Sequence, residues 1–242
     1  MPAAGGGPRL KDRVALITGA SRGLGAALAK RFASEGAQVI LVGRTQGGRE
    51  EVDDAIRAAG GGPATLLPLD LRDFDKIDQM GAAIHRRFGR LDVLVGNAAV
   101  LGRLSPVGHF EPKTWDEVIA TNLTANWRLI RALDPLLRLS DAGRALFVTC
   151  RAARDLEPYW GAYAASKAAL EAMVRIYARE LGITKVSANL VDPGIMATAL
   201  RLRGFPGEDH ARLRAPESVT ETFVALAEAS SLGNGEIIEA VT

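Results

Sequence analysis

Two residues with complementary proton chemistry, Tyr163 and Lys167, stand four positions apart in a helical pattern over residues 159–181. Positions i and i+4 of a helix share one face, so both side chains point into the same space. A phenol titrates near ~10, but a neighbouring ammonium favours the phenolate and lowers this pKa. We therefore expect Tyr163 to exchange a proton with a carbonyl or alcohol oxygen. The alternative is a solvated helix face, because a Tyr-x-x-x-Lys pair alone also arises by chance.

A glycine-rich turn, Thr18 to Gly25, lies between the apolar run 14–18 and the helical pattern 26–35. Glycines permit a tight turn and the close approach of a pyrophosphate. The free N–H groups and the dipole of the following helix favour an anion there. The predicted dinucleotide-binding residues of this turn are Gly19, Ser21, Arg22, Gly23, Leu24 and Gly25.

The same turn also fits G-x-S-x-G, the nucleophile elbow of α/β-hydrolases, with Ser21 as nucleophile. A hydrolase needs an acid and then a histidine downstream, and the only histidines are His85, His109 and His210. None of them has a suitable sequence context. The elbow also normally follows several strands, whereas this turn follows the first. We therefore favour nucleotide binding and keep the serine hydrolase as an alternative.

Apolar β-rich runs alternate with helical patterns along the chain, which predicts βαβ units and a parallel sheet. We expect a single Rossmann-like, doubly wound α/β domain with a mostly parallel seven-stranded sheet and helices on both faces. Residues 1–10 are predicted to be a disordered leader, and residues 11–242 the domain. The segment 196–215 is predicted to be an irregular loop that covers the substrate. The predicted strands are 14–18, 38–42, 65–69, 91–95, 145–149, 186–191 and 236–241; the predicted helices are 26–35, 50–59, 73–88, 112–135 and 159–181, with a last one opening at Pro216.

Composition excludes several classes of function. The 30 basic and 28 acidic residues of this 242-residue chain form no basic stripe, so we expect no nucleic-acid partner. No apolar run reaches the ~18–20 residues that span a bilayer. The single cysteine, Cys150, excludes an intrachain disulfide. Because the first eight residues also lack a signal-peptide pattern, we expect a cytoplasmic protein.

Six motifs follow one another along the chain: the turn from Thr18 to Gly25, Asp70, Asn97-Ala98, Asn122, Tyr163 with Lys167, and Pro193-Gly194 with Thr198. Together, in this order, these motifs resemble the short-chain dehydrogenase/reductase family over nearly the whole chain from Arg13. The segments 161–167 and 204–209 are similar to a poorly characterised group of bacterial oxidoreductases of that family.

The resemblance implies an oxidoreductase that transfers hydride between a nicotinamide cofactor and the carbonyl or alcohol of a small molecule. Tyr163 is then the acid/base, Lys167 lowers its pKa and holds the nicotinamide ribose, and Asn122 supports a water that connects Lys167 to solvent. A homodimer or homotetramer built on the helices 112–135 and 159–181 is also implied. The remaining implied cofactor contacts are Asp70 and Leu71 at the adenine, Asn97 and Ala98 along the sheet edge, and Pro193, Gly194, Ile195 and Thr198 at the nicotinamide.

The residues after the second strand indicate which cofactor is bound. An acidic side chain there would bind the ribose 2′-hydroxyl of NAD, but this strand is followed by Gly43-Arg44-Thr45. Arg22 and Arg44 carry guanidinium groups that suit the 2′-phosphate of NADP. We therefore predict NADP(H) in preference to NAD(H).

Cys150 is the clearest departure from the family pattern, which has a serine thirteen positions before the tyrosine. A thiol is a weaker hydrogen-bond donor than a hydroxyl. Cys150 is thus an imperfect catalytic substitute, or Thr149 takes over, or the protein is a catalytically weak dinucleotide-binding protein. A reactive thiol, favoured as thiolate by Lys167, is a further alternative. Gly96 and Ala99 also replace the usual Asn and Gly, which we interpret as packing adjustments.

The segment 196–215 contains Phe205 and four arginines, Arg201, Arg203, Arg212 and Arg214. The arginines suggest an acidic or phosphorylated substrate. A solvated basic surface or a subunit contact is the alternative interpretation.

Overall fold

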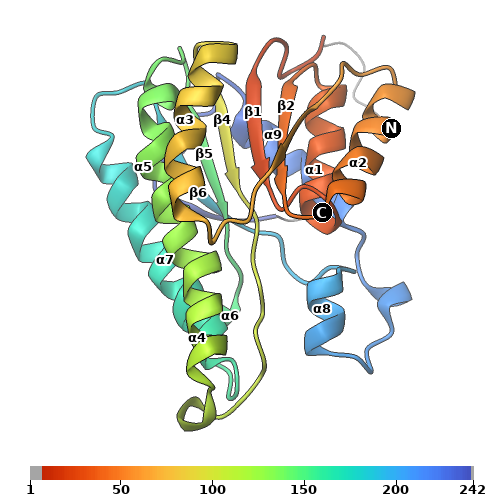
Figure 1. The fold of residues 1–242 in the computed structure, drawn as a ribbon, viewed down its shortest axis with the longest axis vertical. Helices are drawn as coiled ribbons and strands as arrows, with labels where there is room; N and C mark the ends of the chain where they lie inside the picture. Colours follow the sequence, from red (N-terminus) through yellow and green to blue (C-terminus); the bar gives the residue numbers. More distant parts are fainter. Residues whose placement is uncertain (1–6, 241–242) are drawn as a thin grey trace.

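A parallel seven-stranded sheet runs through residues 7–240, the part of the chain that the computed structural model describes (Figure 1). The strand order is β3-β2-β1-β4-β5-β6-β7, so the direction of winding reverses between β1 and β4. The predicted doubly wound fold is thus confirmed. The strands are β1 (Val14–Thr18), β2 (Gln38–Gly43), β3 (Thr65–Pro68), β4 (Val93–Gly96), β5 (Arg144–Val148), β6 (Ser187–Asp192) and β7 (Ile237–Glu239).

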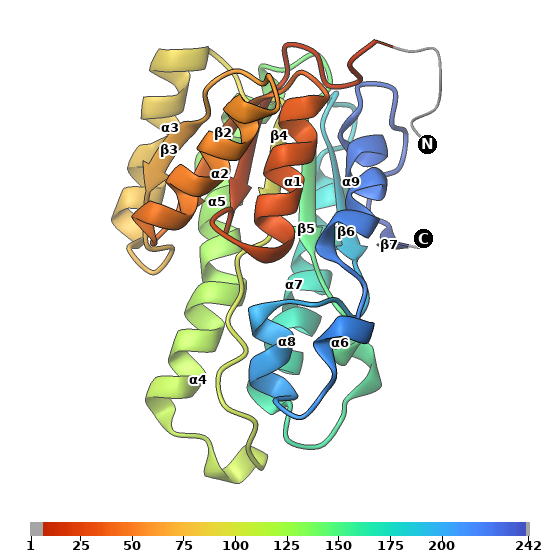
Figure 2. The ribbon, with the colours of Figure 1, turned by 90° about the vertical axis from the view of Figure 1, so that its right-hand side faces the viewer.

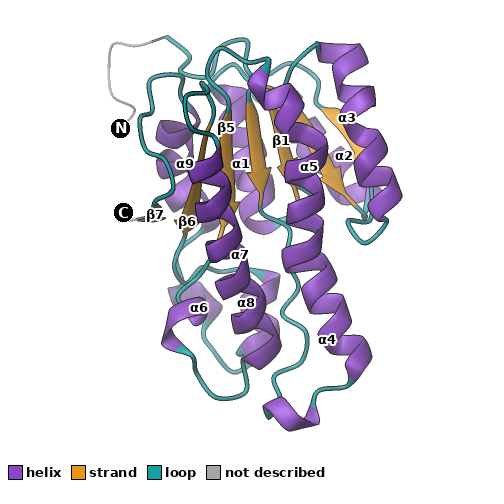
Figure 3. Cartoon of the chain, turned by 90° about the vertical axis from the view of Figure 1, so that its left-hand side faces the viewer, coloured by secondary structure: helices purple, strands orange, loops and turns teal. Residues whose placement is uncertain are grey.

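Helices cover both faces of the sheet. On one face pack α1 (Gly23–Ser34), α2 (Gln46–Ala58) and α9 (Thr220–Ala227), as Figure 2 shows. On the other face pack α3 (Phe74–Phe88), α5 (Ala125–Arg138) and α7 (Gly161–Glu180), as Figure 3 shows. Along β1, Leu16 belongs to the core of one face, and Ala15 and Ile17 to the core of the other. Because alternate side chains enter two dry layers, the central strands are mostly apolar, and their polar residues lie chiefly at the strand ends.

The predicted long helix before β5 consists of three parts. α4 (Pro112–Ile119) passes through a π-helical turn, Ala120–Thr124, directly into α5. Figure 1 shows that α4 extends well beyond the edge of the sheet. The π-helical turn was not predicted, and it carries Asn122. Single π-turns inside α-helices occur frequently at functional sites.

The prediction that residues 196–215 are irregular is wrong in part, because they include the helix α8 (Ala199–Gly204) and a 3₁₀ turn, His210–Arg212. A short helix α6 (Ala152–Asp155), which was not predicted, follows β5. These elements are too short for hydrophobic periodicity to reveal. Further 3₁₀ turns lie at Val107–His109 and at Pro216–Val219, the latter leading into α9.

The ends of the domain also differ from the prediction. Residues 1–6 of the predicted leader lie outside the described residues, but its last two residues belong to the domain. Leu10 is fully buried in the core, and Arg9 forms ion pairs with Glu221 and Glu228. Val241, predicted to end the last strand, lies outside the described residues. Among residues 7–240, no helix combines the length and the apolar character that crossing a bilayer requires.

Gly96 at the end of β4 shows why the family's asparagine is absent from this position. A Cβ built on Gly96 would lie 2.5 Å from Oδ1 of Asn126 and would also collide with the ring of Phe147. Asn126 is itself held by a 2.7 Å hydrogen bond from its Nδ2 to the carbonyl of Asn122. The space of the missing side chain is therefore filled from α5 and β5.

We predict that Gly96→Asn, which restores the family residue, lowers the free energy of unfolding by about 1–3 kcal/mol, because the side chain overpacks a filled site. Urea denaturation measures this change. Gly47→Ala is the matched control, since a Cβ on Gly47 meets nothing within 4 Å. Unchanged stability of Gly96→Asn would show that Phe147 and Asn126 move aside without cost.

Candidate active site

A cleft of about 870 Å³ opens at the carboxyl edge of the sheet, where β1, β2, β4, β5 and β6 end. Ligands of open α/β sheets bind at this edge, next to the point where the strand order reverses. Two predicted site residues, Gly25 and Asn122, lie outside the lining. The predicted residues that line the cleft are Gly19, Ser21, Arg22, Gly23, Leu24, Arg44, Asp70, Leu71, Asn97, Ala98, Cys150, Tyr163, Lys167, Pro193, Gly194, Ile195 and Thr198.

The glycine turn is bound tightly to the end of β4. The hydroxyl oxygen of Thr18 accepts hydrogen bonds from the N–H groups of Asn97 (2.9 Å) and Ala98 (3.1 Å), and Nδ2 of Asn97 donates to the carbonyl of Thr18 (2.8 Å). Gly19 has φ +65° and leaves no room for a side chain against Ala98. Gly25 packs directly on the carbonyl of Gly19, so a side chain there would push the turn away from the helix.

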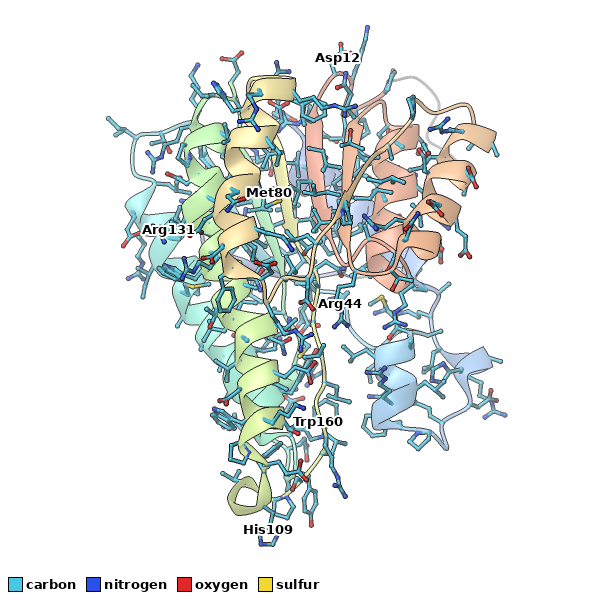
Figure 4. The ribbon with its side chains drawn as sticks, in the orientation of Figure 1. Asp12, Arg44, Met80, His109, Arg131 and Trp160 are labelled. Atoms are coloured by element: carbon cyan, nitrogen blue, oxygen red, sulfur yellow. The ribbon has the colours of Figure 1, made fainter. Side chains whose placement is uncertain are left out.

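The groups around this turn fit an anionic nucleotide. α1 begins after Arg22 without a side-chain cap, so the N–H groups of its first turn remain available at the cleft. Arg22 and Arg44 are exposed at the cleft wall, and Figure 4 shows Arg44 at the carboxyl edge of the sheet. An open helix N-terminus with cationic side chains beside it is a typical phosphate site.

Arg49 on α2 is a cation that the sequence analysis missed. Its side chain is 3% exposed and packs where Gly43 lacks a Cβ. Its Nε donates to the carbonyl of Thr45 (3.2 Å), while Nη1 is buried without a hydrogen-bond partner among the described residues. Its position in the first turns of a helix at the end of β2 was the only available signal. Arg49 adds positive charge beneath the segment that carries Arg44.

Asp70 lines the cleft at the end of β3 and is already paired. The N–H (3.0 Å), Nε (3.1 Å) and Nη2 (2.8 Å) of Arg72 all donate to its carboxylate. The hydrogen bond from the Arg72 side chain lowers the pKa of Asp70, with Arg44 contributing at 3.8 Å. Asp73, rather than Asp70, caps α3. Asp70 thus stays ionised, and its adenine contact remains a prediction.

Tyr163 and Lys167 lie together on α7 as predicted, with Nζ of Lys167 5.9 Å from the centre of the phenol ring. Nζ donates a 2.7 Å hydrogen bond to the carbonyl of Val148, and both side chains are buried. The expected lowering of the tyrosine pKa is not found in this structure. Burial raises the pKa of Tyr163 well above its usual value and lowers the pKa of Lys167, because desolvation penalises both charged forms.

Asn122 anchors the wall of the cleft from behind. Its Oδ1 accepts from the N–H of Val100 (2.9 Å), and its Nδ2 donates to the carbonyl of Val100 (3.0 Å) and to the hydroxyl of Ser166 (3.0 Å). The π-helical turn therefore ties Val100 to α7 at Ser166. The predicted water at Asn122 remains a prediction.

Cys150 contacts Tyr163, and its thiol faces the cleft. Burial raises the pKa of the thiol and outweighs the lowering influence of Lys167, so the interpretation as a reactive thiolate is wrong in direction. Thr149 does not replace Cys150, because its hydroxyl is buried and donates to Oε1 of Glu171 (2.6 Å). Strand alternation turns these neighbouring side chains to opposite sides.

Residues 196–215 form one wall of the cleft. Arg201 donates two hydrogen bonds to Glu208 (2.6 and 2.8 Å), and Arg212 pairs with Asp209 (3.2 Å). Arg214 donates to the carbonyl of Pro193 (3.0 Å), which leaves its charge in place, and among residues 7–240 no carboxylate pairs with Arg203. Two of the four arginines are thus neutralised, which weakens the argument for an acidic substrate.

Aromatic rings line the cleft beside Tyr163. The ring centre of Trp160 lies 5.8 Å from that of Tyr163 and 5.8 Å from that of Phe205, which belongs to the segment 196–215. Gly204 allows close approach here, since a Cβ on it would lie 3.2 Å from Leu101. The segment 196–215 therefore packs on the body of the domain through apolar contacts.

The histidines do not support a hydrolase. All three are described, and none lines the cleft that contains Ser21. His85 is hydrogen-bonded to the carbonyl of Gly89 on α3, and Figure 4 shows His109 at the far tip of the molecule, beyond Trp160. A Ser–His pair in this cleft is absent, so Ser21 has no base.

Comparison with known proteins decides the family. The model of the short chain dehydrogenase family matches residues 13–208. The chain belongs to this family. Oxidoreductase YciK of Escherichia coli, a curated relative, is 36% identical over 219 residues, which is 90% of this chain and 86% of YciK.

Solved structures of short chain dehydrogenases share the fold. One from Escherichia coli CFT073, complexed with NADPH, is 33% identical with a TM-score of 0.92, over 97% of this chain and 99% of that one. Another, from Shigella flexneri and complexed with NADP, is 34% identical with a TM-score of 0.93. The match covers 97% of this chain and 99% of the Shigella chain. The chain thus has the fold of short chain dehydrogenases that have been solved with NADPH or NADP.

We predict that iodoacetamide alkylates Cys150 of the native protein more slowly than the same cysteine in urea at every pH below about 8.5. The reason is that burial raises the pKa of the thiol and lowers the fraction of thiolate. Mass spectrometry follows the reaction without interference, because the chain has one cysteine. Faster labelling of the native protein at pH 7 would contradict the assignment and restore the reactive-thiolate interpretation.

Proposed function

We propose that the protein is an NADP(H)-dependent oxidoreductase that reduces a carbonyl or oxidises an alcohol of a small molecule. The observation that carries the proposal is the meeting, in one cleft, of an uncapped glycine turn, flanking arginines and the Tyr163/Lys167 pair. The NADPH and NADP complexes of the two related structures support this choice of cofactor. NAD(H) is less well matched, because Arg44 stands where an acidic residue would bind the ribose.

Each part of the cofactor has candidate partners in the cleft. The proposed pyrophosphate contacts are the N–H groups at Gly23 and Leu24, and the proposed 2′-phosphate contacts are Arg22 and Arg44, supported by the buried charge of Arg49. The nicotinamide would supply or accept the hydride. The proposed adenine contacts are Asp70 and Leu71, and the contacts towards the nicotinamide are Asn97, Ala98, Pro193, Gly194, Ile195 and Thr198.

Tyr163 is the proposed acid/base. Its raised pKa keeps the phenol protonated at neutral pH, which is the form that donates a proton to a carbonyl oxygen as hydride adds to the carbon. In the reverse direction the phenolate accepts the alcohol proton. Lys167 is proposed to stabilise that phenolate and to bind the nicotinamide ribose. Cys150 is proposed to orient the substrate oxygen beside Tyr163.

The second candidate is a catalytically weak dinucleotide-binding protein. It is favoured by Cys150 alone, because a thiol donates a weaker hydrogen bond than the serine usual in the family. Both candidates share the cofactor site, so only turnover separates them.

The assembly and compartment are proposals as well. A homodimer or homotetramer on the long helices is supported by exposed apolar side chains there, Trp127 on α5 and Ile176 on α7. The cytoplasm is supported by the single cysteine.

We expect Arg44→Ala to weaken NADPH binding by about tenfold, because it removes a charge-assisted contact to the 2′-phosphate, while NADH binding stays unchanged. Fluorescence titration with both nucleotides measures this. Arg57→Ala is the control, since Arg57 pairs with Asp53 at the other end of α2. Equal losses for NADPH and NADH would place the 2′-phosphate elsewhere.

A panel of carbonyl compounds with NADPH tests catalysis. Tyr163→Phe should lower kcat by about 10²–10⁴-fold and leave the Kd for NADPH unchanged, because only proton transfer is lost. Cys150→Ser should raise kcat/KM by roughly fivefold, because a hydroxyl donates the better hydrogen bond. Substantial activity of Tyr163→Phe would place the acid elsewhere. No turnover by wild type or Cys150→Ser would favour the weak binding protein.

A further inference from the structure

Arg154, on the short helix α6, binds two buried carboxylates that belong to different elements. Its Nη1 lies 2.7 Å from Oε1 of Glu171 on α7, and its Nη2 lies 2.7 Å from Oδ2 of Asp192 at the end of β6. Glu171 is 9% exposed and Asp192 is 3% exposed. Burying a carboxylate costs free energy unless its charge is paired, so the guanidinium of Arg154 is needed at this position.

Each partner of Arg154 sits next to a functional element. Glu171 follows Lys167 by one helical turn on α7 and also accepts from Thr149, the residue before Cys150. Oδ1 of Asp192 accepts a 3.0 Å hydrogen bond from the N–H of Gly194, which is one of the residues proposed to contact the nicotinamide. Arg154 therefore ties together the segments that carry Cys150, Lys167 and Gly194.

The position of α6 depends on the two ion pairs of Arg154. α6 has only four residues and ends at Leu156, whose φ of +53° is unfavourable for a side chain of its size. A helix this short has little intrinsic stability. The two ion pairs of Arg154 fix the segment that leaves Cys150.

Arg154 also determines the direction in which the ammonium group of Lys167 points. Both carboxylates act on Lys167 electrostatically, yet its ammonium donates to the carbonyl of Val148 rather than to either of them. Arg154 occupies the oxygens that would otherwise attract the ammonium. With Arg154 and Lys167 positive and Glu171 and Asp192 negative, the group is neutral. Its other three members are buried, whereas the side chain of Arg154 is 35% exposed.

We propose that Arg154 is a positioning residue for the Tyr163/Lys167 pair: it neutralises Glu171 and Asp192 and leaves the ammonium of Lys167 free to face Tyr163 and the cofactor. This inference rests on the proposed roles of Tyr163 and Lys167. Loss of Arg154 leaves one uncompensated negative charge beside the site, which disfavours every anion formed there, including the phenolate of Tyr163 and the thiolate of Cys150.

Other ionisable groups surround this network and remain in place in the variants below. Glu239, for example, lies 4.0 Å from Arg154 and is 71% exposed, so it contributes little. The groups that line the cleft here or contact the network are Tyr163, Lys167 and Glu171 on α7, Cys150, Arg151, Arg154, Asp155 and Glu157 at or beside α6, Asp192 at β6, Glu239 on β7, and Arg214 in the segment 196–215.

The single cysteine makes the proposal testable without a substrate. Below the thiol pKa, the rate of alkylation by iodoacetamide is proportional to the thiolate fraction, so it reports the electrostatic potential beside Tyr163. At pH 8.5, Arg154→Met should slow labelling of Cys150 by about threefold to tenfold, and Glu171→Gln should accelerate it by a similar factor. The double variant has the net charge of the wild type and should return close to the wild-type rate.

The direction of the change in labelling rate distinguishes an electrostatic role of Arg154 from a merely structural one. A merely structural role for Arg154 predicts faster labelling in Arg154→Met, because loosening of α6 exposes the thiol. If Arg154→Met does not fold by circular dichroism, Glu171→Gln and the double variant still test the charge. Arg57→Met, which removes the partner of another buried carboxylate, Asp53, should leave the rate unchanged.

Rates of Arg154→Met and Glu171→Gln that equal the wild type, or faster labelling of Arg154→Met, would overturn the proposal. Because labelling does not require turnover, a protein that reduces no carbonyl can still give the predicted rates. Failure of the proposed function and failure of this inference are therefore distinguishable.

Discussion

The buried ammonium of Lys167 is the constraint on which the rest of the site depends. Its side chain is 2% exposed, and its Nζ donates a hydrogen bond to the carbonyl of Val148 at the end of β5. A buried charge costs several kcal/mol unless its surroundings compensate it. The compensation comes from the end of β5 and from Glu171 and Asp192, which Arg154 holds in turn. The sheet, α6 and α7 thus have to meet at this point.

The end of the cleft proposed to bind the cofactor is built mainly from backbone groups. These are the free N–H groups of an uncapped helix N-terminus and the glycines that bring the turn against β4. Thr18 and Asn97 hold the two strand ends together, so the turn is rigid before any ligand binds. In the proposed function, side-chain charge from Arg22, Arg44 and the buried Arg49 adds selectivity for an extra phosphate. The proposed proton transfer and anion binding then lie side by side at the point where the strand order reverses.

Sequence patterns predicted what depends on periodicity and local motifs. The seven strands and long helices were found because strands with two dry faces are continuously apolar, and the glycine turn and Tyr163/Lys167 lie in the cleft as expected. The sequence did not predict α6, α8 or the π-helical turn at Asn122, which tertiary contacts stabilise. It also did not predict the direction of the Tyr163 pKa, the pairing of Arg201 with Glu208, or the roles of Arg49 and Arg154. These depend on burial and on partners distant in the chain, as Asp192 is from Arg154.

Hydride transfer from NADPH to a carbonyl carbon in this cleft is tested most directly with NADPH deuterated at C4 of the nicotinamide. Both epimeric forms are used, with a panel of aromatic and aliphatic ketones and aldehydes. If the cleft transfers hydride as proposed, one epimer, and not the other, delivers deuterium to the carbinol carbon of a product, which mass spectrometry detects. Consumption of NADPH with no deuterium in any product, or no consumption although NADPH binds, would contradict hydride transfer in this cleft.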